Sequence, residues 1–184
     1  MGRDKALVEL EPGRPLVLVA ASALLDAGAV EVAAVGGDQR ALEGLGLTWR
    51  PDRFPGEGPL GGILTALAAA PTDVVVVVAC DMPGIGPSVP RALVAALAAE
   101  PTAGAAVAVV EGREQPLTAA WRRSVALDAL DAAFADGERA PRRLLGAVGA
   151  VAVTGLAADE LDDVDSPSDL RRYAERHSPS NQKD

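Results

Sequence analysis

The chain has 184 residues, 49% of them hydrophobic and 3% aromatic, and its 26 acidic and 17 basic residues give a net charge of −9. This length fits one domain with a core of Ala, Val and Leu, and the acidic balance excludes nucleic acid as the main partner. The single cysteine, Cys80, excludes an intrachain disulfide, and the only histidine, His177, lies outside the predicted core, which excludes Ser-His-Asp chemistry. The groups that remain available for catalysis or ligand binding are carboxylates, lysine and a hard cation.

The predicted elements alternate between helices and strands along the chain. Helices are predicted at 16–27, 39–45, 60–70, 88–99, 122–135, 139–147 and 167–176. Gly28 is predicted to end the first of these helices, Asp38 to cap the second and Ser88 to cap the fourth. Strands are predicted at 30–35, 47–49, 73–80, 105–110, 115–121 and 150–153. This order predicts an α/β fold with three layers, in which a mostly parallel sheet has helices on both faces. The turn at Glu111–Glu114 predicts one antiparallel element.

The domain boundaries and the cellular location follow from the same survey. We expect one domain over residues 1–176 and a disordered tail over 177–184, because this last segment is short and polar. We see no apolar stretch of about 18 residues and no signal-peptide pattern, so we expect a cytoplasmic protein without a membrane partner.

The most informative segment is the run of five valines from Val74 to Val78, which is followed by Ala79, Cys80 and Asp81. A continuous run of β-branched residues is typical of a strand buried on both faces. Ligands bind outside the carboxyl ends of such strands, so Asp81 is a candidate metal or substrate ligand. The alternative is that Asp81 only caps a turn or the next helix.

Two further groups of acidic residues follow predicted strands, namely Asp52 and the cluster of Asp162, Asp163 and Asp165. Parallel strands end at the same edge of a sheet, so these carboxylates could converge with Asp81 and hold Mg²⁺. The alternative for the cluster is that Asp165 or Ser166 caps the helix that begins at Pro167.

Two segments could contact an anion. Residues 56–62 are rich in glycine and open a helix, so their backbone N–H groups could approach a ligand, although such turns are often plain connections. Lys5, near the N-terminus, is either a solvated surface charge or the point charge that neutralises a phosphate.

These segments, in this order, resemble the molybdenum cofactor guanylyltransferases, within the wider group of Rossmann-like nucleotidyltransferases. The resemblance rests on Met1-Gly2-Arg3-Asp4-Lys5, Gly13-Arg14-Pro15-Leu16, Pro51-Asp52, Gly58-Pro59-Leu60-Gly61-Gly62, Ala79-Cys80-Asp81-Met82-Pro83, Gln115-Pro116-Leu117, Gly137-Glu138-Arg139 and Asp163-Val164-Asp165-Ser166-Pro167-Ser168-Asp169-Leu170. It covers nearly the whole chain. The first match is to the last part of the family's L-A-G-G-x-S-x-R-M-G-x-D-K pattern.

The resemblance implies transfer of GMP from GTP to the phosphate of molybdopterin, with Mg²⁺ and with release of pyrophosphate. It implies that Asp81 is a magnesium and nucleotide ligand, that Lys5 contacts the phosphates, and that Asp52 binds nucleotide. It places Gly58, Pro59 and Leu60 beside the nucleotide and Gln115-Pro116-Leu117 in the half that accepts the pterin. Asp165 stands where many relatives have Asn, and its oxygen keeps a metal-side role.

One departure concerns the family's first strand and glycine loop, L-A-G-G-x-S-x-R, which have no counterpart here. We expect exposed strand edges and apolar surface where that strand would lie. We hypothesise that the start was assigned too late. An in-frame stop codon upstream, before any Ala-Gly-Gly codons, would rule this out.

Two other functions remain open at this stage. The first is a related nucleotidyltransferase that uses CTP or another acceptor, and the second is a truncated, non-catalytic relative. We expect a monomer or a weak homo-oligomer in either case.

Overall fold

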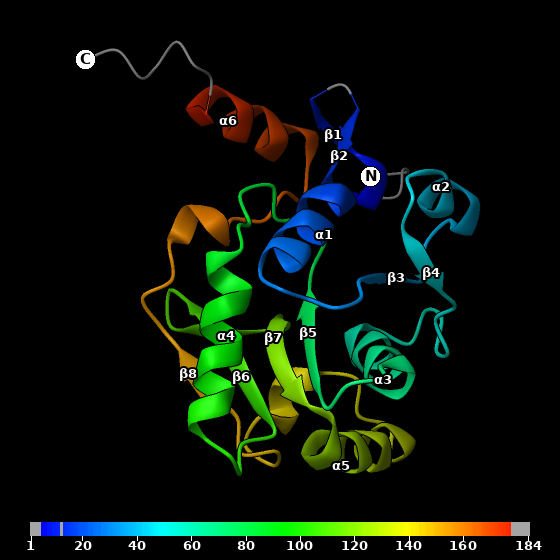
Figure 1. The fold of residues 1–184 in the computed structure, drawn as a ribbon, viewed down its shortest axis with the longest axis vertical. Helices are drawn as coiled ribbons and strands as arrows, with labels where there is room; N and C mark the ends of the chain where they lie inside the picture. The colour runs from blue at the N-terminus through cyan, green and yellow to red at the C-terminus, as the bar shows by residue number, and fades with distance from the viewer. Residues whose placement is uncertain (1–4, 12, 178–184) are drawn as a thin grey trace.

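The computed structural model describes residues 5–11 and 13–177 (Figure 1). Its α-helices are α1 (Leu16–Asp26), α2 (Gln39–Gly44), α3 (Pro59–Ala69), α4 (Ser88–Ala99), α5 (Arg123–Ala135) and α6 (Pro167–His177). Its strands are β1 (Glu9–Glu11), β2 (Arg14–Pro15), β3 (Ala33–Val35), β4 (Thr48–Arg50), β5 (Val74–Val78), β6 (Ala105–Val110), β7 (Arg113–Arg122) and β8 (Val151–Val153). Short 3₁₀ helices are η1 (Lys5–Leu7), η2 (Pro141–Leu144) and η3 (Ala158–Glu160).

The main sheet has four strands in the order β5-β7-β6-β8. β7 runs antiparallel to both β5 and β6, and β8 runs parallel to β6, so β5, β6 and β8 share one direction. β7 is therefore the predicted antiparallel element. Glu111 and Gly112 join β6 to β7 with φ angles of 49° and 77°, the left-handed conformations of a tight hairpin turn.

The remaining strands form separate pairs. β3 and β4 are parallel to each other, and β1 and β2 are antiparallel. The α/β class is confirmed, but the strands lie in three sheets rather than in the one continuous sheet that the sequence suggested.

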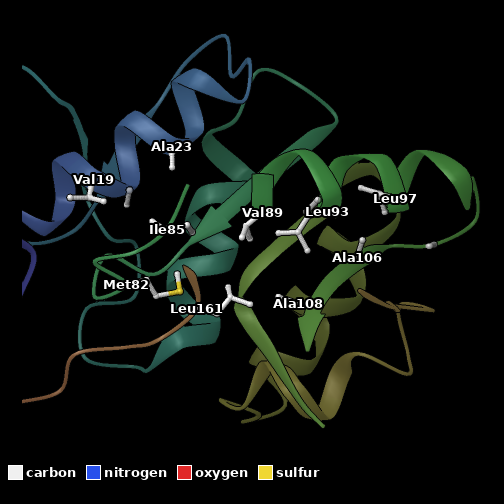
Figure 2. Close-up of a cluster of buried hydrophobic side chains, with 13 residues drawn as sticks. Val19, Ala23, Met82, Ile85, Val89, Leu93, Leu97, Ala106, Ala108 and Leu161 are labelled. Carbon is white, nitrogen blue, oxygen red and sulfur yellow. The ribbon is translucent and has the colours of Figure 1, made fainter. Parts of the chain in front are cut away.

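Helices cover both faces of the main sheet, so the three-layer prediction is confirmed. Val76 and Val78 of β5 pack against the buried cluster that includes residues of α1 and α4. Val75 and Val77 pack against the cluster that includes residues of α3 and α5. Alternate residues of one strand therefore serve opposite layers, as the two-residue period of a strand requires. Figure 2 shows the first cluster, with Val89, Leu93 and Leu97 of α4 above β6.

The valine strand is less buried than predicted. Val74 is 38% exposed, and the other four valines are half-buried. Among the described strands, β5 pairs only with β7. Beside it lies an apolar groove of about 560 Å³, lined by parts of α1, β3, α3, β5 and α4. Among the described strands, β5 is therefore an edge strand, and an apolar groove lies along it.

Three local predictions need correction. Residues 139–147 form only the 3₁₀ turn η2 rather than a helix, and Pro141 lies at its start. Ser88 does not cap α4, whose N-cap position is Pro87, and its hydroxyl instead bonds Glu160. His177, assigned to the tail, closes α6, and the rest of the predicted tail, 178–184, lies outside the described residues. None of the described helices combines the length and apolar character that crossing a membrane requires.

Candidate active site

Asp81 lies in the turn between β5 and α4, three residues after the last valine of the strand. Its carbonyl oxygen accepts a hydrogen bond of 2.9 Å from the backbone N–H of Val164. Its side chain is only 24% exposed. β5 therefore delivers a carboxylate beside a distant part of the chain, the segment after η3.

Lys5 brings that carboxylate together with Asp165. The Lys5 ammonium donates a hydrogen bond to Asp165 Oδ1, and its Nζ lies 3.7 Å from Asp81 Oδ2. Three of the residues predicted from the sequence thus meet, although Lys5 and Asp165 are separated by most of the chain. We call Lys5, Asp81 and Asp165 the carboxylate–lysine cluster.

The charges of this cluster are unevenly balanced. Burial raises the pKa of Asp81 above its ordinary value, and the neighbouring Asp163 and Asp165 add to this, while a backbone hydrogen bond and Lys5 oppose it. The hydrogen bond from Lys5 to Asp165 is the largest cause of a raised pKa at Lys5. One ammonium thus faces several carboxylates, an arrangement that favours a further cation.

Mg²⁺ fits this donor set. It usually takes one or two carboxylates and completes its shell with water and substrate phosphates. Asp81 and Asp165 supply two carboxylates, and the described residues hold no group of three or more His, Cys, Asp or Glu side chains placed to enclose a metal ion. The geometry therefore suits an open site rather than an all-protein cage.

The alternative role of the acidic cluster, as a helix cap, falls to Ser166. The Ser166 hydroxyl accepts a hydrogen bond of 3.2 Å from the backbone N–H of Asp169 and donates one of 2.6 Å to its carboxylate. Capping of α6 and contact with Lys5 are therefore divided between neighbouring residues, which leaves the Asp165 carboxylate for the cluster.

Asp52 belongs to a different set of contacts. Its Oδ1 accepts hydrogen bonds from the Phe54 N–H at 2.9 Å and from the Thr65 hydroxyl at 3.1 Å. The Thr65 oxygen also accepts one from the Arg53 N–H. Asp52 therefore fixes the turn that leads from β4 into the glycine-rich segment.

The glycine-rich segment begins α3. Gly58 is its N-cap with φ 86°, a conformation that favours glycine, and Pro59 occupies the first helical turn. A Cβ atom at Gly61 would lie 2.8 Å from the Cβ of Phe54, so close packing requires glycine there. Glu57 accepts a hydrogen bond of 2.8 Å from Arg139, which anchors the segment to the region after α5.

A polar cleft of about 660 Å³ adjoins the carboxylate–lysine cluster. Asp165 and its acidic neighbours line one part of it, and Arg172, Tyr173 and Arg176 of α6 line another. Arg176 pairs with Asp162 at 2.9 Å. The cleft combines charges of both signs and can therefore accept a polar molecule.

Sequence reasoning missed two residues that hold these segments in place. Thr65 is 2% exposed, and a polar residue in the apolar pattern of α3 was its only signal. Glu160, which bonds the start of α4, left no local signal because its partners are more than 70 residues away.

Comparison with known proteins decides the family. Residues 1–152 match the family described as MobA-like NTP transferase domain. The chain belongs to this family. The molybdenum cofactor guanylyltransferase of Rhodobacter capsulatus is 38% identical to this MobA-like chain over 183 residues, which cover 96% of the chain and 89% of that protein. The probable molybdenum cofactor guanylyltransferase of Chloroflexus aggregans is 41% identical over 144 residues, or 75% of the chain and 66% of that protein. Such relatives are nucleotidyltransferase enzymes.

Solved structures show the same fold as the MobA-like chain. Molybdopterin-guanine dinucleotide biosynthesis protein A from Archaeoglobus fulgidus superposes with a TM-score of 0.74 at 24% identity, covering 95% of this chain and 91% of that one. The 2-C-methyl-D-erythritol 4-phosphate cytidylyltransferase from Thermus thermophilus superposes with a TM-score of 0.72 at 22% identity, covering 94% and 93%. The Rossmann-like nucleotidyltransferase fold predicted from the sequence is confirmed.

Proposed function

We propose that this chain transfers GMP from GTP to the phosphate of molybdopterin and releases pyrophosphate, with Mg²⁺ as cofactor. The observation that carries this proposal is the meeting of Lys5, Asp81 and Asp165 in one cluster. The names of the relatives supply the nucleotide and the acceptor. Cytoplasmic location and a monomeric or weakly oligomeric state stay predictions.

The residues of the cluster have two different roles in this proposal. Asp81 and Asp165 would hold Mg²⁺, which would supply positive charge to the phosphoryl oxygens and help to orient the phosphates. Lys5 neutralises charge that develops on the departing pyrophosphate, because its ammonium is held beside the carboxylates of Asp81 and Asp165. The acceptor phosphate oxygen forms a bond to the α-phosphorus of GTP while the bond to pyrophosphate breaks, so no covalent enzyme intermediate is needed.

The nucleotide is bound by the glycine-rich segment in this proposal. The start of α3, at Gly58, Pro59 and Leu60, offers the positive end of the helix dipole and the backbone N–H groups of Gly58 and Leu60, whereas Pro59 has no N–H. The described hydrogen bonds of Asp52 both end on Oδ1, so a nucleotide would be bound through Oδ2.

Pyrophosphate release tests the choice of nucleotide and acceptor. The chain would be incubated with Mg²⁺, molybdopterin and each of the four nucleoside triphosphates in turn. We expect release with GTP above that with the other three. A preference for CTP would contradict the guanylyltransferase assignment and favour a related nucleotidyltransferase.

Nucleotide binding by the 184-residue chain is tested separately. We expect Mg-GTP to raise its melting temperature, because a ligand that binds only the folded state stabilises it. If titration with Mg-GTP gives neither heat nor a shift, the chain is a non-catalytic relative.

A further inference from the structure

The loop between β5 and α4 lies against the segment that contains η3 and the acidic cluster. At one end, the Asp81 carbonyl bonds the Val164 N–H at 2.9 Å. In the middle, a Cβ atom built at Gly84 would overlap the carbonyl oxygen of Asp159, so the two backbones approach too closely for a side chain. Met82, Ile85 and Leu161 join the same buried cluster (Figure 2).

Glu160 connects the other end of these two segments. Its Oε1 accepts a hydrogen bond of 3.1 Å from the Gly86 N–H, and its Oε2 accepts one of 2.7 Å from the Ser88 hydroxyl. The carboxylate thus occupies the start of α4, where the N-cap Pro87 makes no side-chain cap and where the helix dipole favours negative charge. A charged group from η3 therefore fixes the entry of α4.

We propose that Glu160 is a positioning residue that sets the separation of the two metal-binding carboxylates. This inference rests on the proposed function. Asp81 comes from the loop before α4, and Asp165 comes from the segment after η3. Their separation therefore depends on how these two segments are joined, and Glu160 joins them at the end opposite the Asp81–Val164 bond.

Metal binding measures this role without turnover. Mn²⁺ would be titrated into the chain with a non-hydrolysable GTP analogue, and free Mn²⁺ would be followed by electron paramagnetic resonance. We expect Glu160→Ala to weaken Mn²⁺ binding by about tenfold, which is the effect expected when a group that orients metal ligands is lost. Glu160→Gln should restore most of the affinity. The Ser88 hydroxyl also lies 2.5 Å from Oε1, so an amide oxygen at the Oε1 position accepts hydrogen bonds from both Gly86 and Ser88.

A second variant leaves Glu160 in place. Gly84→Ala should also weaken Mn²⁺ binding, because its methyl group would force the Asp159 backbone away from the loop. Gly84 does not have a positive φ, so the effect is steric. If Glu160→Ala does not fold, Gly84→Ala provides the same test.

Glu100→Ala is the matched control, because Glu100 is an exposed glutamate that follows α4. It should bind Mn²⁺ as the unmodified chain does. Folded Glu160→Ala or Gly84→Ala protein with unchanged Mn²⁺ affinity would overturn the inference. Failure of the unmodified chain to release pyrophosphate from GTP would instead reject the proposed function, since the Mn²⁺ measurement does not depend on turnover.

Discussion

Asp81 and Lys5 contribute to the site through different physical effects. Asp81 is half-buried, and burial raises its pKa, whereas Lys5 lies between carboxylates that stabilise its charge. In the proposed function, Asp81→Ala would remove one of the two carboxylates that hold the metal, whereas Lys5→Ala would remove a positive charge and leave both carboxylates in place. The two residues should therefore differ in how severely their removal affects turnover.

Lys5→Ala should lower turnover by roughly 10²-fold, the size of effect that follows loss of one group stabilising transition-state charge. The rate constant would be measured at saturating Mg-GTP and molybdopterin. Lys5→Arg keeps the charge but not the compact ammonium, and should recover part of the rate. Unchanged turnover in Lys5→Ala would show that Lys5 is only a surface charge.

Thr65→Val should destabilise the fold by about 1–3 kcal/mol, because the Arg53 N–H and the Gly61 carbonyl lose the buried hydroxyl that pairs with them. Unfolding in urea measures the change. Thr65→Ser keeps the hydroxyl and serves as the control. Equal stability of the valine and serine variants would contradict the role given to this hydroxyl.

At the scale of elements, helices begin with help from other parts of the chain. The Asp73 carboxylate, just before β5, accepts a hydrogen bond of 2.7 Å from the Ser124 N–H in the first turn of α5. This bond lowers the pKa of Asp73 below its ordinary value. The Asp73 carbonyl also accepts a bond from Arg123. One residue thus ties the start of α5 to the start of the valine strand.

Asp73→Ala should cost about 0.5–1 kcal/mol of stability at neutral pH, toward the low end for a helix cap because Asp73 is exposed. A lowered pKa in the folded state means that this stabilisation is present above the ordinary pKa of Asp and is lost as the pH falls through the folded value. Urea unfolding at pH 7 and below pH 4 should show a difference that shrinks in acid. Asp131→Ala, which removes an exposed carboxylate on α5, is the control.

The sequence predicted most helices, strands and turns more accurately than the contacts that join them to distant segments. The glycine after α1, the Asp38 cap of α2 and the two-residue turn between β6 and β7 are local signals, and each prediction based on them is close to the structure. The prediction of a helix at 139–147 was wrong. The segment has an apolar pattern, but Pro141 begins a short 3₁₀ turn there instead. Ser88 was misassigned because its partner, Glu160, comes from a distant segment.

At the scale of the whole molecule, the fold explains why residues from both ends of the chain meet. The segment after β8 returns to the loop that follows β5, where the Val164 N–H bonds the Asp81 carbonyl. Lys5 of η1 contacts the carboxylates of both Asp81 and Asp165. Convergence at strand ends was predictable for Asp81 and Asp165 from the α/β pattern. For Asp52, by contrast, the described contacts are with the turn before α3 and with Thr65, an arrangement that required the three-dimensional fold.

The net charge of −9 adds a constraint at this scale, because the chain repels an anionic substrate at long range. In the proposed function, the positive charge of Lys5, together with Mg²⁺, would offset that repulsion locally. The proposed function therefore depends most on the carboxylate–lysine cluster.

The role of the carboxylate–lysine cluster is tested most directly by transfer of label from α-phosphate-labelled GTP to molybdopterin. The assay compares the unmodified chain, Asp81→Ala and Asp131→Ala, which is the exposed-carboxylate control. We expect labelled dinucleotide and unlabelled pyrophosphate from the unmodified chain and the control, and no detectable product from Asp81→Ala. Near-normal product formation by Asp81→Ala would contradict the metal-binding role of Asp81 and the account built on it.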